Sequence, residues 1–156
     1  MSSLSTTYYL LPAINTMADK LLLTILTPEK AFFTDKEADF VSFPAFDGEM
    51  GVLPGHASFV VQLKEGVLKY RDDHKKDIFS VLSGFAEVHK NRVLILAEEA
   101  EFAKEIDEER ARQAYQKAKD ALAMRGTPDM DLDAAQAALR RAIVRMKIAE
   151  LQKRYK

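Results

Sequence analysis

Two kinds of hydrophobic spacing divide the chain: short β-type runs in its first two thirds and helical spacing in its last third. Between residues 20 and 97 the apolar runs are separated by turn-rich pieces such as Phe46-Asp47-Gly48 and Pro54-Gly55. Many short strands at close spacing are typical of a sandwich or a barrel. The predicted runs are LLLTILT, ADFVSF, SFVVQL, GVLKY, IFSVLS, FAEV and RVLILA.

The last third predicts two amphipathic helices joined by a tight turn. Asp107 is a preferred N-cap residue, Gly126 and Pro128 end the first helix, and Asp131 or Asp133 caps the second. The facing stripes are mostly alanine, and an alanine methyl group buries little apolar area, so we expect a weak seam between the helices. The stripes are Ala111, Ala114, Tyr115, Ala118, Ala121 and Leu122 in the first helix, and Ala135, Ala138, Leu139, Ala142, Met146 and Ala149 in the second.

The predicted fold class is mainly β plus α, with an N-terminal β-sandwich followed by a C-terminal antiparallel two-helix hairpin. The hydrophobic period changes from two to 3.6 within residues 98–104, which predicts a sandwich domain over 17–100 and a hairpin over 101–156. RVLILA is apolar on both faces, which predicts a central strand. Residues 1–16 contain no Lys or Arg and fit neither a secretory nor a transit signal, so we expect a disordered extension or an upstream start site.

Composition narrows the classes of function. The chain has 23 basic and 24 acidic residues, so it lacks the basic excess that indicates nucleic-acid binding. It has no cysteine, which excludes disulfides and thiol chemistry and is consistent with a reducing compartment. No apolar run approaches the ~18–20 residues that span a bilayer, so we expect membrane association only through a partner.

The sequence offers no catalytic or metal-binding motif. His56, His74 and His89 lack the paired spacings of metal sites, and there is no GxSxG elbow, Walker loop or GxGxxG after a strand. We therefore predict no catalytic residues and no metal ligands. His56 fits a turn histidine satisfied by backbone hydrogen bonds better than it fits a ligand.

Two segments remain as candidate binding sites. Residues 44–57 contain three glycines and two prolines, which predicts a structured loop that is either a pair of turns or a docking loop. In an antiparallel hairpin, Arg145 would lie near the start of the first helix and Arg141 about one turn away. With Arg110 these guanidinium groups would converge on one anion, and Asp107 would accept from a base or ribose or orient an arginine. The alternative is ordinary helix surface, with Asp107 and Arg110 as a pair worth roughly 0.2–0.5 kcal/mol.

The same residues resemble the epsilon subunit family of bacterial-type F-type ATP synthases. The resemblance rests on DGEMGVLPGHA (47–57), on the strand pair SGFAEV and RVLILAEEAE, and on the hairpin segments Ile106–Ala111 and Leu139–Ala142. It covers the chain from Met17 onward. Ser58 departs from the pattern, since relatives usually have proline after Gly-His-Ala.

The resemblance implies a non-catalytic rotor subunit at the cytoplasmic face of the bacterial plasma (inner) membrane, held there as a peripheral protein. The implied partners are the gamma subunit, the c-subunit ring and the alpha and beta subunits, with Glu49 and Met50 matching the turn that contacts the ring. The hairpin is implied to be a movable inhibitor. Folded on the sandwich it permits turnover, and extended along gamma it blocks ATP hydrolysis.

The resemblance also implies ATP as a regulatory ligand, with no cofactor required. Two alternatives remain open: a stand-alone ATP-binding sensor, which would not co-purify with gamma, and a small β-sandwich enzyme, which would need a pocket of perturbed titratable groups. The matched ATP-binding residues are Glu101, Ile106, Asp107, Arg110, Ala111, Arg141 and Arg145.

Overall fold

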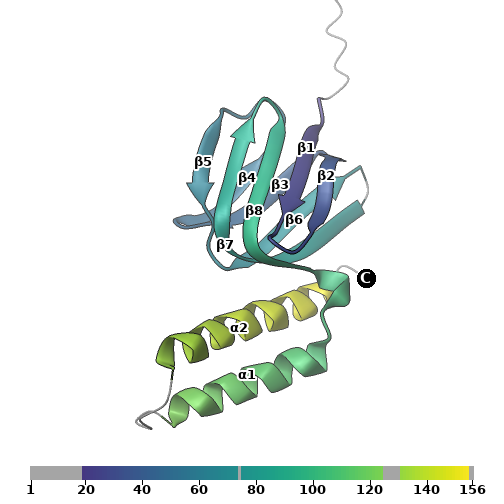
Figure 1. The fold of residues 1–156 in the computed structure, drawn as a ribbon. Coiled ribbons are helices and arrows are strands. Elements are labelled where there is room, and N and C mark those ends of the chain that lie inside the picture. The colour runs from purple at the N-terminus through teal and green to yellow at the C-terminus, as the bar shows by residue number, and fades with distance from the viewer. Residues whose placement is uncertain (1–18, 74, 125–130, 155–156) are drawn as a thin grey trace, which may run out of the picture.

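The structure is a computed structural model that describes residues 19–73, 75–124 and 131–154 (Figure 1). The expected N-terminal extension and the expected turn around Gly126 and Pro128 lie outside the described residues. In the described part, a β-sandwich lies above an antiparallel pair of helices, as the hydrophobic spacing predicted (Figure 1). The predicted fold class is therefore confirmed.

The sandwich is built from eight strands in the order β2-β1-β8-β7-β6-β3-β4, with β5 paired to β7. In Figure 1, β5, β7, β8, β1 and β2 form one layer and β3, β4 and β6 lie behind it. The core between the layers is aliphatic and aromatic, with Phe43 and Phe79 as its largest fully buried side chains. The strands are β1 (Leu21–Leu26), β2 (Ala31–Ala38), β3 (Phe40–Ala45), β4 (Gly48–Val52), β5 (Phe59–Gln62), β6 (Gly66–Asp72), β7 (Lys75–His89) and β8 (Arg92–Phe102).

The runs IFSVLS and FAEV belong to one long strand, β7, rather than to two. The first half of β7 pairs with β6 and its second half with β5, so the strand passes between the two pairings near Ser83 and Gly84. Both residues have positive φ, and a Cβ on Gly84 would lie 1.9 Å from the carbonyl oxygen of Leu96. Glycine is required here because the backbone of β8 occupies the space of a side chain.

Half of the segment 44–57, predicted as a structured loop, is strand. β3 ends at Ala45 and β4 begins at Gly48, and the two pair as a hairpin. The sequence pattern missed β4 because its two glycines interrupt the alternation of apolar and polar side chains. The rest is the turn at Phe46 and Asp47 between the two strands and the irregular part after Val52, where Gly55 has a φ of 83°.

β8 is a central strand, as predicted, since it pairs in parallel with β1 and antiparallel with β7. Its two faces differ. Val93, Ile95 and Ala97 are buried in the core, whereas Leu96 points outward and is 45% exposed.

The helical part begins at Ala103 with the short 3-10 helix η1 (Ala103–Glu105) and continues as α1 (Glu108–Ala123) and α2 (Leu132–Arg154). The Asp107 side chain accepts a hydrogen bond of 2.8 Å from the backbone N–H of Arg110, which confirms the predicted N-cap. Asp131 accepts in the same way from Ala134 at 2.9 Å, so Asp131 rather than Asp133 caps α2. None of the helices in the described ranges is both long and apolar enough to cross a bilayer.

The helix α2 buries two faces, and sequence spacing identified only one. Its alanine face packs on α1 as expected, with Ala142 and Ala149 buried. Val144 and Ile148, which the predicted stripe did not include, belong to a second apolar cluster that joins the hairpin to the sandwich. The buried members of this cluster are Val67, Ile78, Ala103, Ile106, Ala111, Val144, Ile148 and Ala149.

Candidate functional site

Three of the predicted ATP-binding residues meet where α2 crosses the end of β8. The Nε atom of Arg145 donates a 2.7 Å hydrogen bond to Glu101, and Arg141 Nη1 lies 3.4 Å from Glu99. Arg141 and Arg145 are four residues apart, so a helix places them on one face, and here that face looks onto the sandwich. Glu99 was not predicted from sequence, because nothing in the local pattern indicates that the end of β8 lies beneath α2.

The same two arginines border a hollow of about 360 Å³ between α1 and α2. Its remaining walls are mostly alanine methyl groups, among them Ala114 and Ala118 of α1. Lys117 contributes a third cation to this hollow. Lys117 lies outside the predicted apolar stripe of the first helix, and only the packing of α2 shows that it lines this hollow.

The remaining predicted ATP-binding residues lie apart from this hollow. Ile106 and Ala111 are buried in the cluster between hairpin and sandwich, and Asp107 uses its carboxylate as the helix cap. Arg110 is exposed and lines neither the hollow nor the junction with β8.

The helix register explains this separation. Glu108 at the start of α1 pairs with Lys153 near the end of α2 at 2.6 Å. Arg145 precedes Lys153 by about two turns of α2, so it lies beside Ala114 of α1 rather than beside Arg110. The expected convergence of three guanidinium groups is therefore not seen in this packing.

The two predicted ring-contact residues have different environments. The Glu49 carboxylate accepts hydrogen bonds of 2.9 Å from Lys69 and from the Ser42 hydroxyl. The bond from Lys69 is the main reason why the pKa of Glu49 is below its usual value. Met50 faces the core and is half-buried. The most exposed apolar side chains near this hairpin are Phe46, at 65%, and Leu53, at 55%.

A further apolar surface lies on the outer face of β5, β7 and β8. Phe85 is 55% exposed and sits between Gln62 of β5 and Leu96 of β8 in the strand register. Val60 on β5 is exposed as well. We call Val60, Phe85 and Leu96 the outer apolar patch. The apolar faces of RVLILA predicted only that β8 is a central strand, so this exposed surface was not predicted from the sequence.

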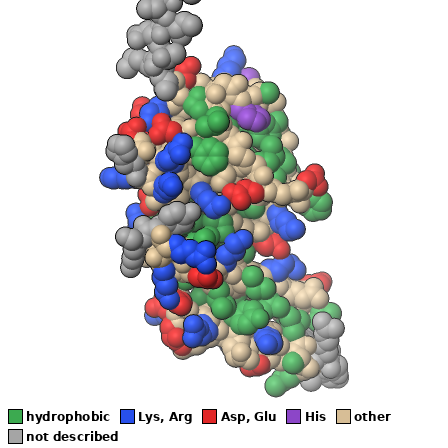
Figure 2. All heavy atoms as spheres, turned by 180° about the vertical axis from the view of Figure 1, so that it is seen from behind, with side chains coloured by type: hydrophobic (Ala, Val, Ile, Leu, Met, Phe, Trp, Pro, Cys, Tyr) green, Lys and Arg blue, Asp and Glu red, His purple; other side chains and the backbone are tan. Residues whose placement is uncertain are grey.

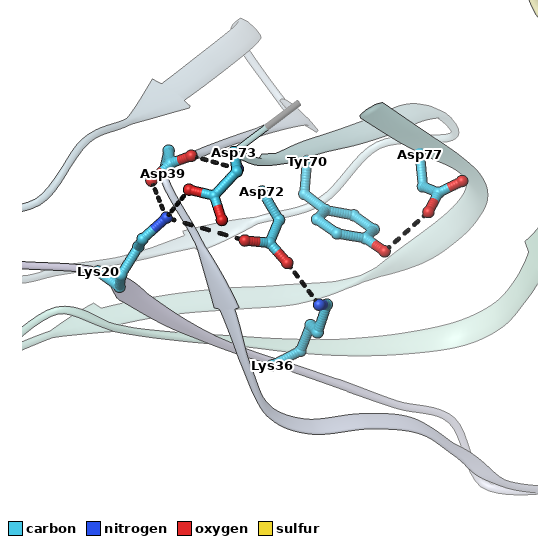
Figure 3. A network of polar contacts seen from close by, with 7 residues as sticks. All are labelled: Lys20, Lys36, Asp39, Tyr70, Asp72, Asp73 and Asp77. Carbon is cyan, nitrogen blue, oxygen red and sulfur yellow. Dashed lines mark hydrogen bonds and ion pairs between the residues drawn. The ribbon is translucent and has the colours of Figure 1, made fainter. Parts of the chain in front are cut away.

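One group of carboxylates resembles a metal site, but it surrounds a lysine. Oxygen atoms of Asp39, Asp72 and Asp73 lie within 4.8 Å of one another, and this is the only such group in the described ranges. The Lys20 ammonium forms ion pairs with all three carboxylates (Figure 3). Lys36 pairs with Asp72 at 2.6 Å from the other side. The positive charge of this cluster is therefore supplied by the chain itself, and the network ties Lys20, just before β1, and Lys36 of β2 to the end of β6.

His56 and His89 have local partners. The Nδ1 atom of His56 lies 2.9 Å from the carbonyl oxygen of Ala57, which confirms a turn histidine with a backbone hydrogen bond. His89 lies 3.0 Å from the Ser58 hydroxyl. His74 is outside the described residues.

The fold and these surfaces define a two-part protein, a β-sandwich with a helical hairpin docked on one end. Two family models match consecutive parts of the chain. Residues 20–103 match the β-sandwich domain of the ATP synthase delta/epsilon chain, and residues 104–150 match its long α-helix domain. The chain belongs to the ATP synthase delta/epsilon chain family.

Curated relatives and solved structures agree with this assignment. The ATP synthase epsilon chain of Symbiobacterium thermophilum is 44% identical over 133 residues, covering 85% of this chain and 94% of the relative. That of Desulforamulus reducens is 44% identical over 134 residues, covering 86% of this chain and all of the relative. A chain in the Euglena gracilis mitochondrial ATP synthase, from a structure of OSCP, F1 and c-ring, aligns with a TM-score of 0.65 and 26% identity, covering 88% of this chain and 82% of that chain.

Proposed function

We propose that this chain is a non-catalytic central-stalk subunit of F-type ATP synthase, which joins the gamma subunit to the c ring. Epsilon-chain relatives that match over nearly their whole length support this function, as does the likeness to a chain of an F1 and c-ring assembly. Membership in the family associates the chain with a membrane-bound complex. We place it as a peripheral protein on the cytoplasmic face of the bacterial inner membrane, which it reaches through the other subunits.

Two exposed surfaces support a role inside an assembly. The outer apolar patch presents aromatic and aliphatic side chains to solvent on one face of the sheet, and such surfaces mark protein contacts. We assign this patch to gamma. We assign the β3–β4 hairpin, with Glu49 and Met50 and the exposed Phe46 at its turn, to the c ring. A stand-alone ATP sensor would have no partner to cover these surfaces, so the subunit role is favoured over that alternative.

The regulatory part of the proposal concerns the hairpin. Docked on the sandwich it leaves hydrolysis unhindered, and released along gamma it contacts alpha and beta and inhibits. The position of Arg141 and Arg145 supports this regulatory role. Both side chains form ion pairs with the sandwich and also border the hollow between the helices. Both helices line the hollow, so an anion held there would be lost if the helices separated on release, and it would favour the docked, closed hairpin by its differential affinity.

ATP fits the chemistry of this hollow. Its volume of about 360 Å³ is within the ~300–1,000 Å³ of small-molecule sites. Alanine methyl groups accept the flat face of a base, and Lys117, Arg141 and Arg145 supply charge for the phosphates. Arg145 uses Nε for Glu101, which leaves its two terminal nitrogens for a second acceptor. ATP at ~100 times its dissociation constant would stabilise the docked form by about 2.7 kcal/mol.

The test is isothermal titration of ATP into the full chain, with Arg141→Ala beside the wild type. A charge-assisted hydrogen bond is worth about 1.5–3 kcal/mol, so we expect affinity to fall by about tenfold or more. Arg154→Ala is the matched control, since Arg154 forms an ion pair with Glu150 of its own helix. If millimolar ATP produces no heat of binding with the wild type, the ATP-sensing role is refuted and only the rotor role remains.

A further inference from the structure

We propose that three arginine–glutamate pairs form a salt-sensitive latch that holds the hairpin on the sandwich without any ligand. The pairs, called the latch below, are Arg140–Glu65, Arg141–Glu99 and Arg145–Glu101, with separations of 3.5, 3.4 and 2.7 Å. Every arginine belongs to α2 and every glutamate to the sandwich. The inference rests on the movable hairpin of the proposed function and adds what keeps it docked when no ATP is bound.

The latch joins α2 to two separate places on the sandwich. Glu65 lies between β5 and β6, whereas Glu99 and Glu101 lie at the end of β8. The helix therefore cannot slide or turn on the sandwich without breaking at least one pair. From behind, basic and acidic side chains lie close together along the junction of the sandwich and the hairpin (Figure 2).

The latch and the apolar contact share one helix face. Arg141, Val144, Arg145 and Ile148 follow the spacing of a single face, and Val144 lines the same narrow hollow as the two arginines and their glutamates. Lifting α2 would therefore break the ion pairs and expose Val144 in one motion. This coupling makes the release of the hairpin sensitive to ionic conditions.

Burial decides the strength of the latch. The side chains are partly exposed, from 29% for Glu101 to 53% for Glu99, so salt reaches them. One exposed pair changes an equilibrium by about 1.5- to fivefold, and three independent pairs would together change the docked-to-released ratio by about 3- to 100-fold. Arg140–Glu65 is informative because neither residue belongs to the predicted ATP-binding set.

The experiment measures release directly in the full chain. The protein has no cysteine, so Val144→Cys introduces a single thiol at a position that is 6% exposed at the junction. A small thiol reagent reacts there only while the hairpin is lifted, and the labelling rate reports the opening equilibrium. Val93→Cys places the thiol in the sandwich core, so its labelling rate reports unfolding of the whole sandwich and can be compared directly with the rate at position 144.

We expect Glu65→Gln and Glu99→Gln each to raise the labelling rate at position 144 by about 1.5- to fivefold. Raising salt from ~0.05 M to ~0.5 M should speed labelling of the otherwise unchanged chain, and less so when both glutamates are replaced. Arg154→Gln is the control, since its pair with Glu150 stays within α2. The exchanged pair Glu65→Arg with Arg140→Glu should restore slow labelling.

Two results separate the latch from the movable hairpin. If position 144 labels faster than position 93 but responds neither to salt nor to the glutamate replacements, the latch is refuted and the movable hairpin stands. If the two positions label at the same rate under all conditions, the hairpin opens only when the sandwich unfolds. That outcome would overturn both the latch and the proposed switch.

Discussion

Replacing Ile148 by alanine tests whether the apolar contact of α2 is what docks the hairpin. Ile148 is fully buried in the cluster with Val67, Ile78 and Ile106. An isoleucine-to-alanine change at such a position costs about 2–5 kcal/mol, through lost transfer energy and the cavity left behind. Because Val67 and Ile78 belong to the sandwich, most of this loss falls on the docking contact. The docked-to-released ratio should then fall by about 30-fold or more.

The assay is limited trypsin digestion of the full chain, with a thermal melt of the sandwich alongside. We expect faster cleavage within α2, which carries Arg140, Arg141 and Lys147, and little change in the melting of the sandwich. Ile143→Ala makes the same chemical change on the opposite, exposed side of α2. Its effect should be about 0.5 kcal/mol or less.

The docking role of Ile148 would be refuted if Ile148→Ala and Ile143→Ala gave the same digestion pattern, because burial on the sandwich would then contribute nothing. It would also be refuted if Ile148→Ala lowered the melting temperature of the sandwich as much as it released the hairpin. The hairpin would then be part of one cooperative core.

Three further predictions concern the sandwich. A fragment of residues 19–103 should unfold cooperatively, whereas one ending at residue 100 should be less stable because Phe102 packs on Phe79 with ring centroids 4.3 Å apart. Gly84→Ala should lower the melting temperature strongly, since its Cβ would overlap the Leu96 carbonyl oxygen, and an unchanged melt would contradict the described backbone. The hydrogen bond from Lys20 lowers the pKa of the Asp39 carboxyl group in the folded protein. This interaction therefore stabilises the fold above the pKa of Asp39 in the unfolded chain, ~3.9, and the stabilisation is lost as the pH falls through the pKa of Asp39 in the folded protein. Asp39→Asn should therefore lose less stability than the wild type on acidification, and parallel urea titrations at several pH values would show it.

Local signals predicted most elements of this fold, although no predicted run covers β2 (Ala31–Ala38). Asp107 and Asp131 are helix caps because their short carboxylates reach the free N–H groups of the first turn, which depends only on neighbours in sequence. Alternating apolar residues predicted the core strands for a similar reason. The same signals failed at β4, where glycine removes the alternation, and at β7, where Ser83 and Gly84 suggested a break that the chain does not make.

The candidate site depended on tertiary structure to a greater degree. The sequence by itself determined that Arg141 and Arg145 share a face of α2, since helix geometry fixes the relation between residues four apart. It did not determine what that face meets, because the partners Glu99 and Glu101 are more than forty residues away. The sequence also did not show that Lys117 borders the hollow and Arg110 does not. Which of the two borders it depends on the register between α1 and α2. Such contacts follow from packing over long distances in the chain, and only the folded structure specifies them.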